Sequence, residues 1–495
     1  MDYVIKSWRG GISDEDNRGI QGAYKFGYAI DIHKRKDSLS SKQAMATILT
    51  SGSLGTTLTS HFNFFVPASD GTTYCFGAQG SIFALSGDGT WTFVYNDENG
   101  KIRGAAEWEL DDGVNYLYWA TATSLARKRL PGSETSITPD TSAPSLVWEQ
   151  RWTDVTADYK TTLNSREWHT MKQASGQLAI ANGESLGSVE FDGDFNAAVL
   201  NIRPGNLIKT IEERDDYTIL GSGKEDGSEE GHIWSWLTTA TNYIQKKRIP
   251  IKGVNAIIQT EFNLLQGGDD GELFLSDFVT PIPLAKVTGG GSVFPGGVSI
   301  EDDLAIFGFS GSSATYPGIW SYGRRMKNRP TVLGYDYRLA SAVAGSTIST
   351  VAAVLATNGV TLVSWGSTES DSSIYGVDQV SSTTKATAVY EGLEFDAGSP
   401  QIKKFFDSAK VVMAPLPSGS LISLKYKIDN ETSWRYAVTG DNATTYSVAD
   451  STEAEFKITD DGAILEIGTE LNPTLNLSPE ILSISVIFEP EQEHA

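Results

Sequence analysis

The sequence predicts an all-β protein: a β-propeller followed by a C-terminal β-sandwich, with an irregular N-terminal arm. The first observation behind this prediction is a recurring phrase, in which an apolar strand and a glycine turn precede Gly-x-aliphatic-aromatic. The aliphatic residues Ile82, Val189, Ile233, Leu273 and Ile319 mark five copies, and the last four are spaced 44, 40 and 46 residues apart. That period is the length of one four-stranded propeller blade. Because a blade cannot cover its own two apolar faces, blades must stack into a closed ring.

Composition is the second observation. The 495 residues include 49 glycines, 12 tryptophans, 19 tyrosines and 20 phenylalanines. Aromatic and β-branched residues occur in short runs between Gly, Asn, Asp and Ser, a pattern typical of strands joined by tight turns. Helix-type periodic runs rich in Ala, Leu, Glu and Lys do not occur. Both observations therefore favour a strand-rich fold.

The predicted elements follow one another along the chain. Residues 1–55 are interpreted as an arm with one strand pair in residues 23–32, and its aromatic side chains argue against full disorder. The propeller is predicted over residues 56–378, where hairpin signals such as Ala-Ser-Asp-Gly-Thr at 68–72 separate short strands. We expect six to eight blades, with seven as the best count. The loop-rich residues 131–175 indicate an insertion in the second blade.

A different pattern occupies residues 379–490. The stretches 388–395, 420–428 and 481–488 alternate apolar and polar residues with a strict period of two. Such strands bury one face each, which predicts a β-sandwich. The charged residues 491–495 are expected to form a frayed tail.

The formal net charge of −23 argues against a sequence-independent grip on nucleic acid, because that requires cations facing phosphates. The same charge suits a surface along which DNA slides without being held, although a merely soluble acidic protein is the more ordinary interpretation. Cys75 is the single cysteine, so no intrachain disulfide is expected. The N-terminal residues show no signal-peptide pattern, and no run of about 18 apolar residues occurs, so we expect cytoplasmic synthesis and no membrane span.

The sequence predicts no catalytic residues, no metal site and no cofactor, and therefore a protein that is not an enzyme. The five histidines are dispersed, which argues against zinc. The stretch 192–203 opens like a calcium loop but has Ala197 and Arg203 where glycine and glutamate belong. The stretch 86–91 resembles the Asp-box turn of sialidase-type propellers but is two residues too short, so a plain β-turn is the better interpretation.

Three basic clusters follow what we interpret as the outer ends of blade strands, at residues 127–129, 246–248 and 324–329. Regular placement would create a positive rim that contacts an acidic neighbour. The candidate interface residues in the rim are Arg324, Arg325, Lys327 and Arg329. The alternative is that these charges only protect exposed edge strands from pairing.

Several segments resemble β-propeller virion proteins of tailed bacteriophages, with the nozzle proteins of short-tailed phages as the nearest architectural relatives. The segments are residues 7–12, 27–39, 68–74 and 321–324. The resemblance covers about residues 1–375 through short motifs, and it departs at the C-terminus, where one sandwich replaces a larger set of platforms.

The resemblance implies a virion location and a structural role in a phage tail. The expected partners are copies of the chain in a ring, neighbouring tail proteins, genomic DNA passing without sequence-specific binding, and possible contact with the host surface. Aromatic residues dominate interface energetics, so the predicted arm anchors are Trp8, Arg9, Tyr24 and Phe26. Two alternatives stay open: a receptor-binding or glycan-binding propeller, and a propeller glycan hydrolase.

Overall fold

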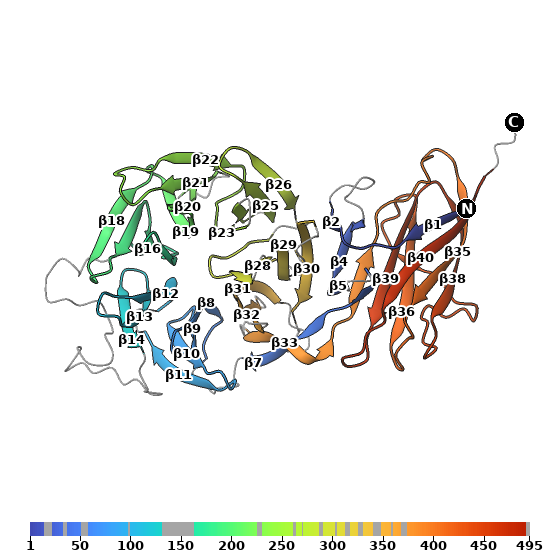
Figure 1. Cartoon of the computed structure of the whole chain (residues 1–495), viewed down its shortest axis with the longest axis horizontal. Helices are drawn as coiled ribbons and strands as arrows, with labels where there is room; N and C mark the ends of the chain where they lie inside the picture. Colours follow the sequence, from blue (N-terminus) through green and yellow to red (C-terminus); the bar gives the residue numbers. More distant parts are fainter. Residues whose placement is uncertain are drawn as a thin grey trace. The chain divides into compact units, whose positions relative to one another are not determined.

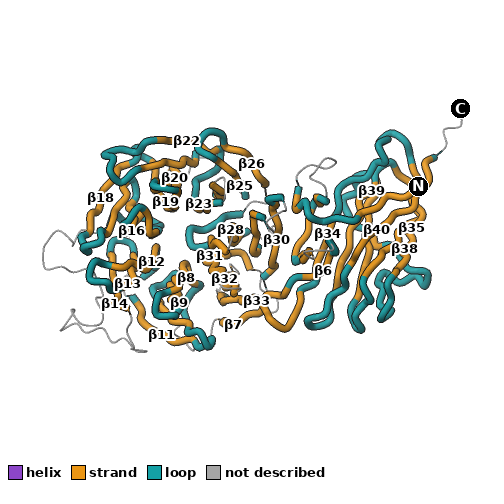
Figure 2. Tube along the Cα trace, viewed as in Figure 1, coloured by secondary structure: helices purple, strands orange, loops and turns teal. Residues whose placement is uncertain are grey.

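The computed structural model describes the chain except for short gaps and one longer gap. The described residues are 1–13, 22–32, 37–50, 58–97, 100–130, 163–224, 230–260, 264–269, 271–286, 291–301, 304–311, 317–324, 330–339, 348–357, 360–367 and 374–491. Within them every regular element is a β-strand (Figure 2). No helix in this part of the chain could cross a membrane.

Internal contacts divide the chain into two units. The propeller unit comprises residues 47–317 and 341–379, and the sandwich unit comprises residues 1–46, 318–340 and 380–495. The sequence instead predicts consecutive segments, 1–55, 56–378 and 379–490. The structure therefore differs in that both units are built from segments far apart in the chain.

The propeller unit consists of antiparallel sheets that follow one another in sequence (Figure 1). The first two are β8 (Phe62–Pro67), β9 (Thr73–Gly77), β10 (Ser81–Leu85) and β11 (Trp91–Asn96), then β12 (Gly104–Glu109), β13 (Asn115–Ala120) and β14 (Leu125–Leu130). The next two are β15 (Met171–Ala174), β16 (Gln177–Asn182), β17 (Ser185–Val189) and β18 (Phe195–Asn201), then β19 (Asn206–Arg214), β20 (Tyr217–Lys224), β21 (Gly231–Trp236) and β22 (Gln245–Ile249).

The remaining sheets complete the unit. They are β23 (Ala256–Gln259), β24 (Leu264–Gly267), β25 (Glu272–Ser276) and β26 (Pro281–Lys286), the pair β27 (Val298–Glu301) and β28 (Leu304–Phe309), and finally β31 (Ile348–Thr357), β32 (Val360–Ser367) and β33 (Tyr375–Lys385) with β7 (Gln43–Thr50). The innermost strands contact one another in the order β8, β12, β15, β19, β23, β27, β31 and back to β8. This closed ring of seven inner strands in the described residues confirms the β-propeller and its seven blades.

Stacking between blades explains the recurring phrase. In the blades of the propeller unit the aliphatic residue of the phrase lies in or at the end of the third strand and is buried, as in Ile82, Val189, Ile233 and Leu273. Ile319, which marks the last copy, is also buried but lies in β29 (Gly318–Gly323) of the sandwich unit. Trp119 and Trp234 are likewise fully buried in clusters that join neighbouring blades. Since these side chains leave water only when blades stack, burial of apolar surface drives closure of the ring.

A clasp between the first and last strands closes the propeller. The N-terminal strand β7 is the outer strand of the last blade, next to β33. The buried carboxylate of Asp378 in β33 accepts hydrogen bonds from Thr47 Oγ1 at 2.8 Å and from Trp365 Nε1 at 2.7 Å. One side chain thus joins the first strand of the ring to the body of its last blade.

The sandwich unit has two main sheets. The first contains β38 (Glu453–Gly462), β35 (Lys404–Met413), β40 (Ile481–Pro490), β6 (Leu39–Ser41), β5 (Ile30–Ile32) and β1 (Asp2–Ile5). The second contains β29 (Gly318–Gly323), β30 (Val332–Arg338), β4 (Phe26–Tyr28), β34 (Ala388–Glu391), β39 (Leu465–Asn472), β36 (Leu421–Ile428) and β37 (Arg435–Tyr436). A short parallel pair, β2 (Gly11–Ile12) and β3 (Ala23–Tyr24), also belongs to this unit.

One apolar core fills the space between the two sheets, and this confirms the predicted sandwich. Phe406 and Ile484 enter it from the first sheet, and Leu424 and Ile467 enter it from the second. The N-terminal residues contribute as well, because β1 pairs with β40, and β4 pairs with both β30 and β34. The residues expected to form an arm therefore supply several strands rather than one pair.

Candidate functional site

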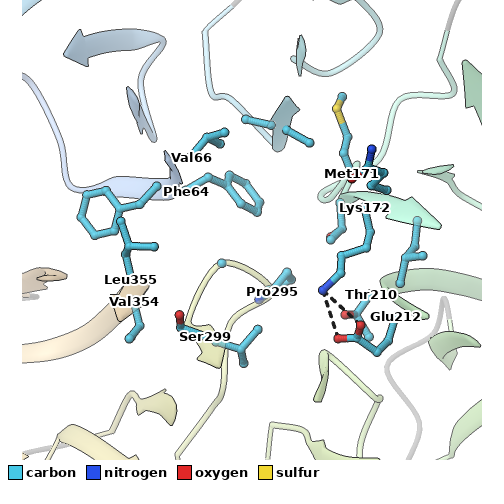
Figure 3. A pocket seen from close by; sticks show the side chains of 18 of the residues that line it. Phe64, Val66, Met171, Lys172, Thr210, Glu212, Pro295, Ser299, Val354 and Leu355 are labelled. Carbon is cyan, nitrogen blue, oxygen red and sulfur yellow. Dashed lines mark hydrogen bonds and ion pairs between the residues drawn. The ribbon is translucent and has the colours of Figure 1, made fainter. Parts of the chain in front are cut away.

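The candidate site is the central cavity of the propeller. The cavity has a volume of about 480 Å³ and is lined by the inner strands of the blades (Figure 3). Its apolar wall includes Phe64 and Val66 of β8, Met171 of β15 and Leu355 of β31. All four side chains are largely buried in the apolar clusters between neighbouring blades, so they border the cavity at its edges.

An ion pair forms the most polar part of the wall. Lys172 of β15 lies beside Glu212 of β19, with Nζ 3.1 Å from Oε1 and 3.2 Å from Oε2 (Figure 3). Glu212 is buried and Lys172 is half-buried. Hydrogen bonding to both oxygens offsets part of the cost of removing the carboxylate from water.

A second carboxylate, Glu107 of β12, also lines the cavity. It accepts hydrogen bonds from the backbone N–H of Ser69, at 3.1 Å and 3.0 Å, and from the Ser69 hydroxyl. Ser69 follows β8, so this contact joins the first blade to the second. Both carboxylates of the cavity wall therefore also hold neighbouring blades together.

A loop crosses one end of the cavity. Residues 291–297 lie between β26 and β27 and reach the centre of the ring (Figure 1). Gly296 approaches Asn63 of the first blade so closely that an added Cβ would lie 1.9 Å from its carbonyl oxygen. The backbone N–H of Val354, in the last blade, donates to Gly296 O at 2.9 Å.

Aromatic rings pack beside this loop. Trp168 packs edge-on against Phe294, with ring centroids 5.9 Å apart, and against Phe64, with centroids 6.1 Å apart. The amine of Lys101 lies 4.3 Å from the Trp168 ring centroid, a cation–π contact. Burial lowers the pKa of Lys101. We call Phe64, Trp168 and Phe294 the aromatic cap.

The arrangement accommodates a small group with an apolar body and a polar end. Acid hydrolysis of a glycosidic bond requires two carboxylates around the bond, and Glu107 and Glu212 are the carboxylates that line this cavity. Among the described residues no group of three or more His, Cys, Asp or Glu side chains could hold a metal ion. Cys75 is buried as expected, and burial raises the pKa of its thiol.

The predicted arm anchors lie in the sandwich unit. Trp8 and Tyr24 are buried in its core, where both rings pack against Tyr390 at centroid distances of 6.3 Å and 5.8 Å. Phe26 is half-buried beside other rings, and Arg9 forms an ion pair with Asp37. The structure thus brings two of the four residues together around one ring inside the chain's own core.

The basic clusters are placed differently from the sequence interpretation. Residues 127–129 and 246–248 lie within the edge strands β14 and β22 rather than after them. Lys128 is buried, and its amine donates to the Tyr74 hydroxyl at 3.3 Å. Arg324 is half-buried. Arg325, Lys327 and Arg329 lie outside the described residues.

Sequence reasoning did not identify the Lys172–Glu212 pair. The two residues are 40 positions apart on strands of adjacent blades, and neither belongs to a recognisable motif. Their spacing matches the blade period, so an alignment of the blades with one another would have placed both on inner strands. The sequence contains no signal for the lateral register that brings them into contact.

Comparisons with known proteins add little beyond the fold. No family model matches the chain, and no curated protein matches it. Similar solved structures include the WD40 β-propeller domain of Doa1, with 13% identity over 69% of this chain and 98% of that one and a TM-score of 0.44. Another is the set of RRP9 WD40 repeats, with 12% identity over 64% and 94% and a TM-score of 0.43. Both TM-scores are below 0.5, so the propeller assignment depends on the closed ring of inner strands, and no property of these proteins is transferred to the chain.

Proposed function

We propose that this protein is a structural subunit of a bacteriophage tail, present as a ring of copies around the path of the DNA and docking other tail proteins. The virion setting is supported by the resemblance of residues 7–12, 27–39, 68–74 and 321–324 to phage propeller proteins. The structural role is supported by the geometry of the propeller. Docking, rather than catalysis, is what a closed and internally bonded ring is suited to do.

The observation that carries the proposal is the clasp at Asp378. Its carboxylate binds both Thr47 of β7 and Trp365 of β32. A propeller closed in this way does not open at one blade without leaving a buried carboxylate and two donors unpaired, which costs about 1–3 kcal/mol per group. A subunit in a tail must keep its docking surfaces fixed while DNA moves past, and a closed ring meets that requirement.

The net charge of −23 suits the same role. Like charges repel, so an acidic lining would let DNA pass without a grip on its phosphates. Virion copies would be held by contacts between proteins, because the net negative charge of the chain repels DNA.

The experiment that tests the proposal has two parts. Light scattering and electron microscopy of the purified chain should reveal rings whose population rises with protein concentration. Antibody labelling of phage particles should then mark the tail. A chain that stays monomeric at every concentration and is absent from particles would overturn the proposal.

The glycan hydrolase is a second candidate because one cavity is lined by both Glu107 and Glu212. Its test is release of reducing sugar from host-surface polysaccharide by the intact chain and by E107Q and E212Q variants. Activity that either substitution abolishes would favour the hydrolase. Binding of polysaccharide without release of sugar, unchanged by the substitutions, would favour a glycan-binding propeller instead.

A further inference from the structure

The connections of the propeller fall on two opposite faces. Strands within a blade are antiparallel, so successive connections alternate between the ends of the ring. We call one end the turn face; it carries the connections at residues 68–72, 86–90, 110–114, 175–176, 190–194, 215–216, 237–244 and 277–280. We call the other end the linker face; it carries those at 78–80, 97–103, 121–124, 163–170, 183–184, 202–205, 230, 250–255, 268–271 and 291–297.

Contacts between blades support this assignment. The backbone N–H of Asp111, in a turn of the second blade, donates to Phe191 O in a turn of the third at 2.8 Å. The backbone N–H of Ser175, in the third blade, donates to Glu213 at the end of β19 at 2.7 Å. Turns of neighbouring blades therefore meet at one end of the ring.

The two faces differ in charge. The eight turn-face connections named above, all from the first five blades, contain ten carboxylates and no lysine or arginine: Asp70, Asp88, Asp111, Asp112, Glu190, Asp192, Asp194, Asp215, Asp216 and Asp277. The connection between β29 and β30, which begins at Arg324, belongs to the sandwich unit and is not among them. The described residues of the linker-face connections contain five of each sign: Asp97, Glu167, Glu184, Glu230 and Asp269 against Lys101, Arg103, Arg166, Arg203 and Lys252. All ten turn-face carboxylates are exposed except that of Asp70, which is half-buried.

Local turn chemistry accounts for the aspartates but not for their charge. In five of the turns an aspartate oxygen accepts a hydrogen bond from the backbone N–H two residues later, as Asp88 does from Thr90 at 2.9 Å and Asp192 from Asp194 at 3.0 Å. Asparagine makes the same turn, because its side-chain oxygen accepts the same hydrogen bond without a charge. The turn conformation therefore does not explain why these positions repeatedly carry a charged residue rather than asparagine.

Exposed apolar side chains gather on the same face. Phe191 is 52% exposed, Ile244 50% and Val279 70%, and each lies in a turn-face connection. Tyr217, directly after the turn at 215–216, is 39% exposed. The described linker-face connections contain no comparably exposed large apolar residue. Aromatic anchors among rim charges are the composition of a protein-docking surface.

We propose that the turn face docks a positively charged surface of a partner protein, in which lysines and arginines alternate with apolar side chains. The cations meet the ten carboxylates, and the apolar groups pack on Phe191, Ile244 and Val279. This inference rests on the proposed docking role and names the face and the partner's chemistry. DNA is excluded as the occupant, because its phosphates repel this face.

The test compares two variants with the same change in charge. The turn-face variant is D192N/D194N/D215N/D216N, and the matched linker-face variant is E167Q/E184Q/E230Q/D269N. The probe is a fluorescein-labelled peptide of repeated Lys-Leu-Ser, and its binding to the full chain is followed by fluorescence anisotropy at two salt concentrations. Asparagine retains the turns, because its side-chain oxygen accepts the same backbone hydrogen bond as aspartate.

We expect the turn-face variant to bind the peptide about tenfold more weakly at low salt, and the linker-face variant less than about twofold more weakly. Phe191→Ser should weaken binding several-fold at both salt concentrations, since its contribution is not electrostatic. Carbodiimide cross-links from peptide lysines should map to the turn-face carboxylates. Equal loss in the two charge variants, or cross-links spread over both faces, would overturn the inference.

The outcomes separate this inference from the proposed function. If the protein is absent from phage particles but only the turn-face variant loses peptide binding, the tail proposal fails and the docking inference stands. If the chain forms rings and labels tails but the peptide does not distinguish the faces, the docking inference fails alone.

Discussion

The polar side chains at the two ends of the propeller make different kinds of contact. On the linker face, polar side chains join one blade to the next: Lys209 Nζ lies 2.9 Å from Asn255 Oδ1 and 3.7 Å from Asp269 Oδ2. On the turn face, aspartates bond mainly to the backbone of their own turns and stay exposed. The difference teaches that one end contributes to holding the ring closed, while the other end carries charge and apolar surface that the fold does not require.

His169 is an example of a linker-face residue that is hydrogen-bonded to two blades. Its ring is fully buried, with Nδ1 2.8 Å from Ala181 O and Nε2 3.0 Å from Ala122 O. The backbone N–H of the same residue donates to Arg103 O at 2.8 Å. Burial lowers the pKa of His169, and so do the nearby cations Arg103 and Arg166. One residue therefore joins the second and third blades through both backbone and side chain.

The largest expected loss of stability comes from a steric clash at a glycine. A Cβ at Gly104 would lie 1.7 Å from the His169 carbonyl oxygen, whereas a Cβ at Gly87, in a turn-face connection, meets nothing within 4 Å. We expect Gly104→Ala to destabilise the propeller by at least about 3 kcal/mol and Gly87→Ala to stay within about 0.5 kcal/mol of the parent. Urea unfolding followed by tryptophan fluorescence measures both. Similar losses in the two variants would contradict the contrast between the faces.

The second effect concerns pH. Burial lowers the pKa of both His61 and His232 to about 4, from an ordinary value of 6.5. Both lie at the linker-face ends of their blades. The unfolded chain binds protons at these residues at a higher pH than the folded chain does, so their contribution to stability is complete above pH 6.5 and is lost as the pH falls toward 4.

We therefore expect the free energy of unfolding to fall between about pH 6.5 and about pH 4, and to fall less in the H61Q/H232Q variant. Parallel urea titrations of the two proteins measure the slopes. The D192N/D194N/D215N/D216N variant serves as the control and should keep the parent slope. Identical slopes for the parent and the histidine variant would show that these residues do not control the acid sensitivity.

The smallest effect is electrostatic. Removing four charges from the crowded turn face relieves repulsion, so D192N/D194N/D215N/D216N should leave stability unchanged or raise it by about 0.5–1 kcal/mol at low salt. E167Q/E184Q/E230Q/D269N should lower it, because Glu230 pairs with Lys224 and Arg248, and Asp269 pairs with Lys209. Thermal unfolding at low and high salt measures both. If both variants changed the stability in the same direction, the two faces would not differ in the role of their charges.

The sequence predicted the fold because the signals for it are local. Each aliphatic residue of the phrase, such as Ile233 or Leu273, marks a strand whose burial requires a neighbouring blade. The period-two stretches at 420–428 and 481–488 likewise became the buried strands β36 and β40. Period and alternation are properties of short segments, so one chain is enough to detect them.

The candidate site was not predictable in the same way. The Lys172–Glu212 pair depends on register between blades, and the cap depends on residues 291–297 crossing to Asn63 and Val354. The strands of residues 1–46 were also underestimated, because each is only two to four residues long apart from β7. Such short strands form through pairing with distant segments, and a single sequence does not show those partners.

The clasp also determines when the propeller can close during synthesis of the chain. Thr47 is synthesised early, but its hydrogen-bond acceptor Asp378 follows 331 residues later. Until then the ring has a gap, and the edge that β7 will cover does not yet exist. Long-range pairing of this kind slows folding and leaves apolar edges exposed to other chains. Completion of the propeller is consequently a late event, reached only after nearly four-fifths of the polypeptide has left the ribosome.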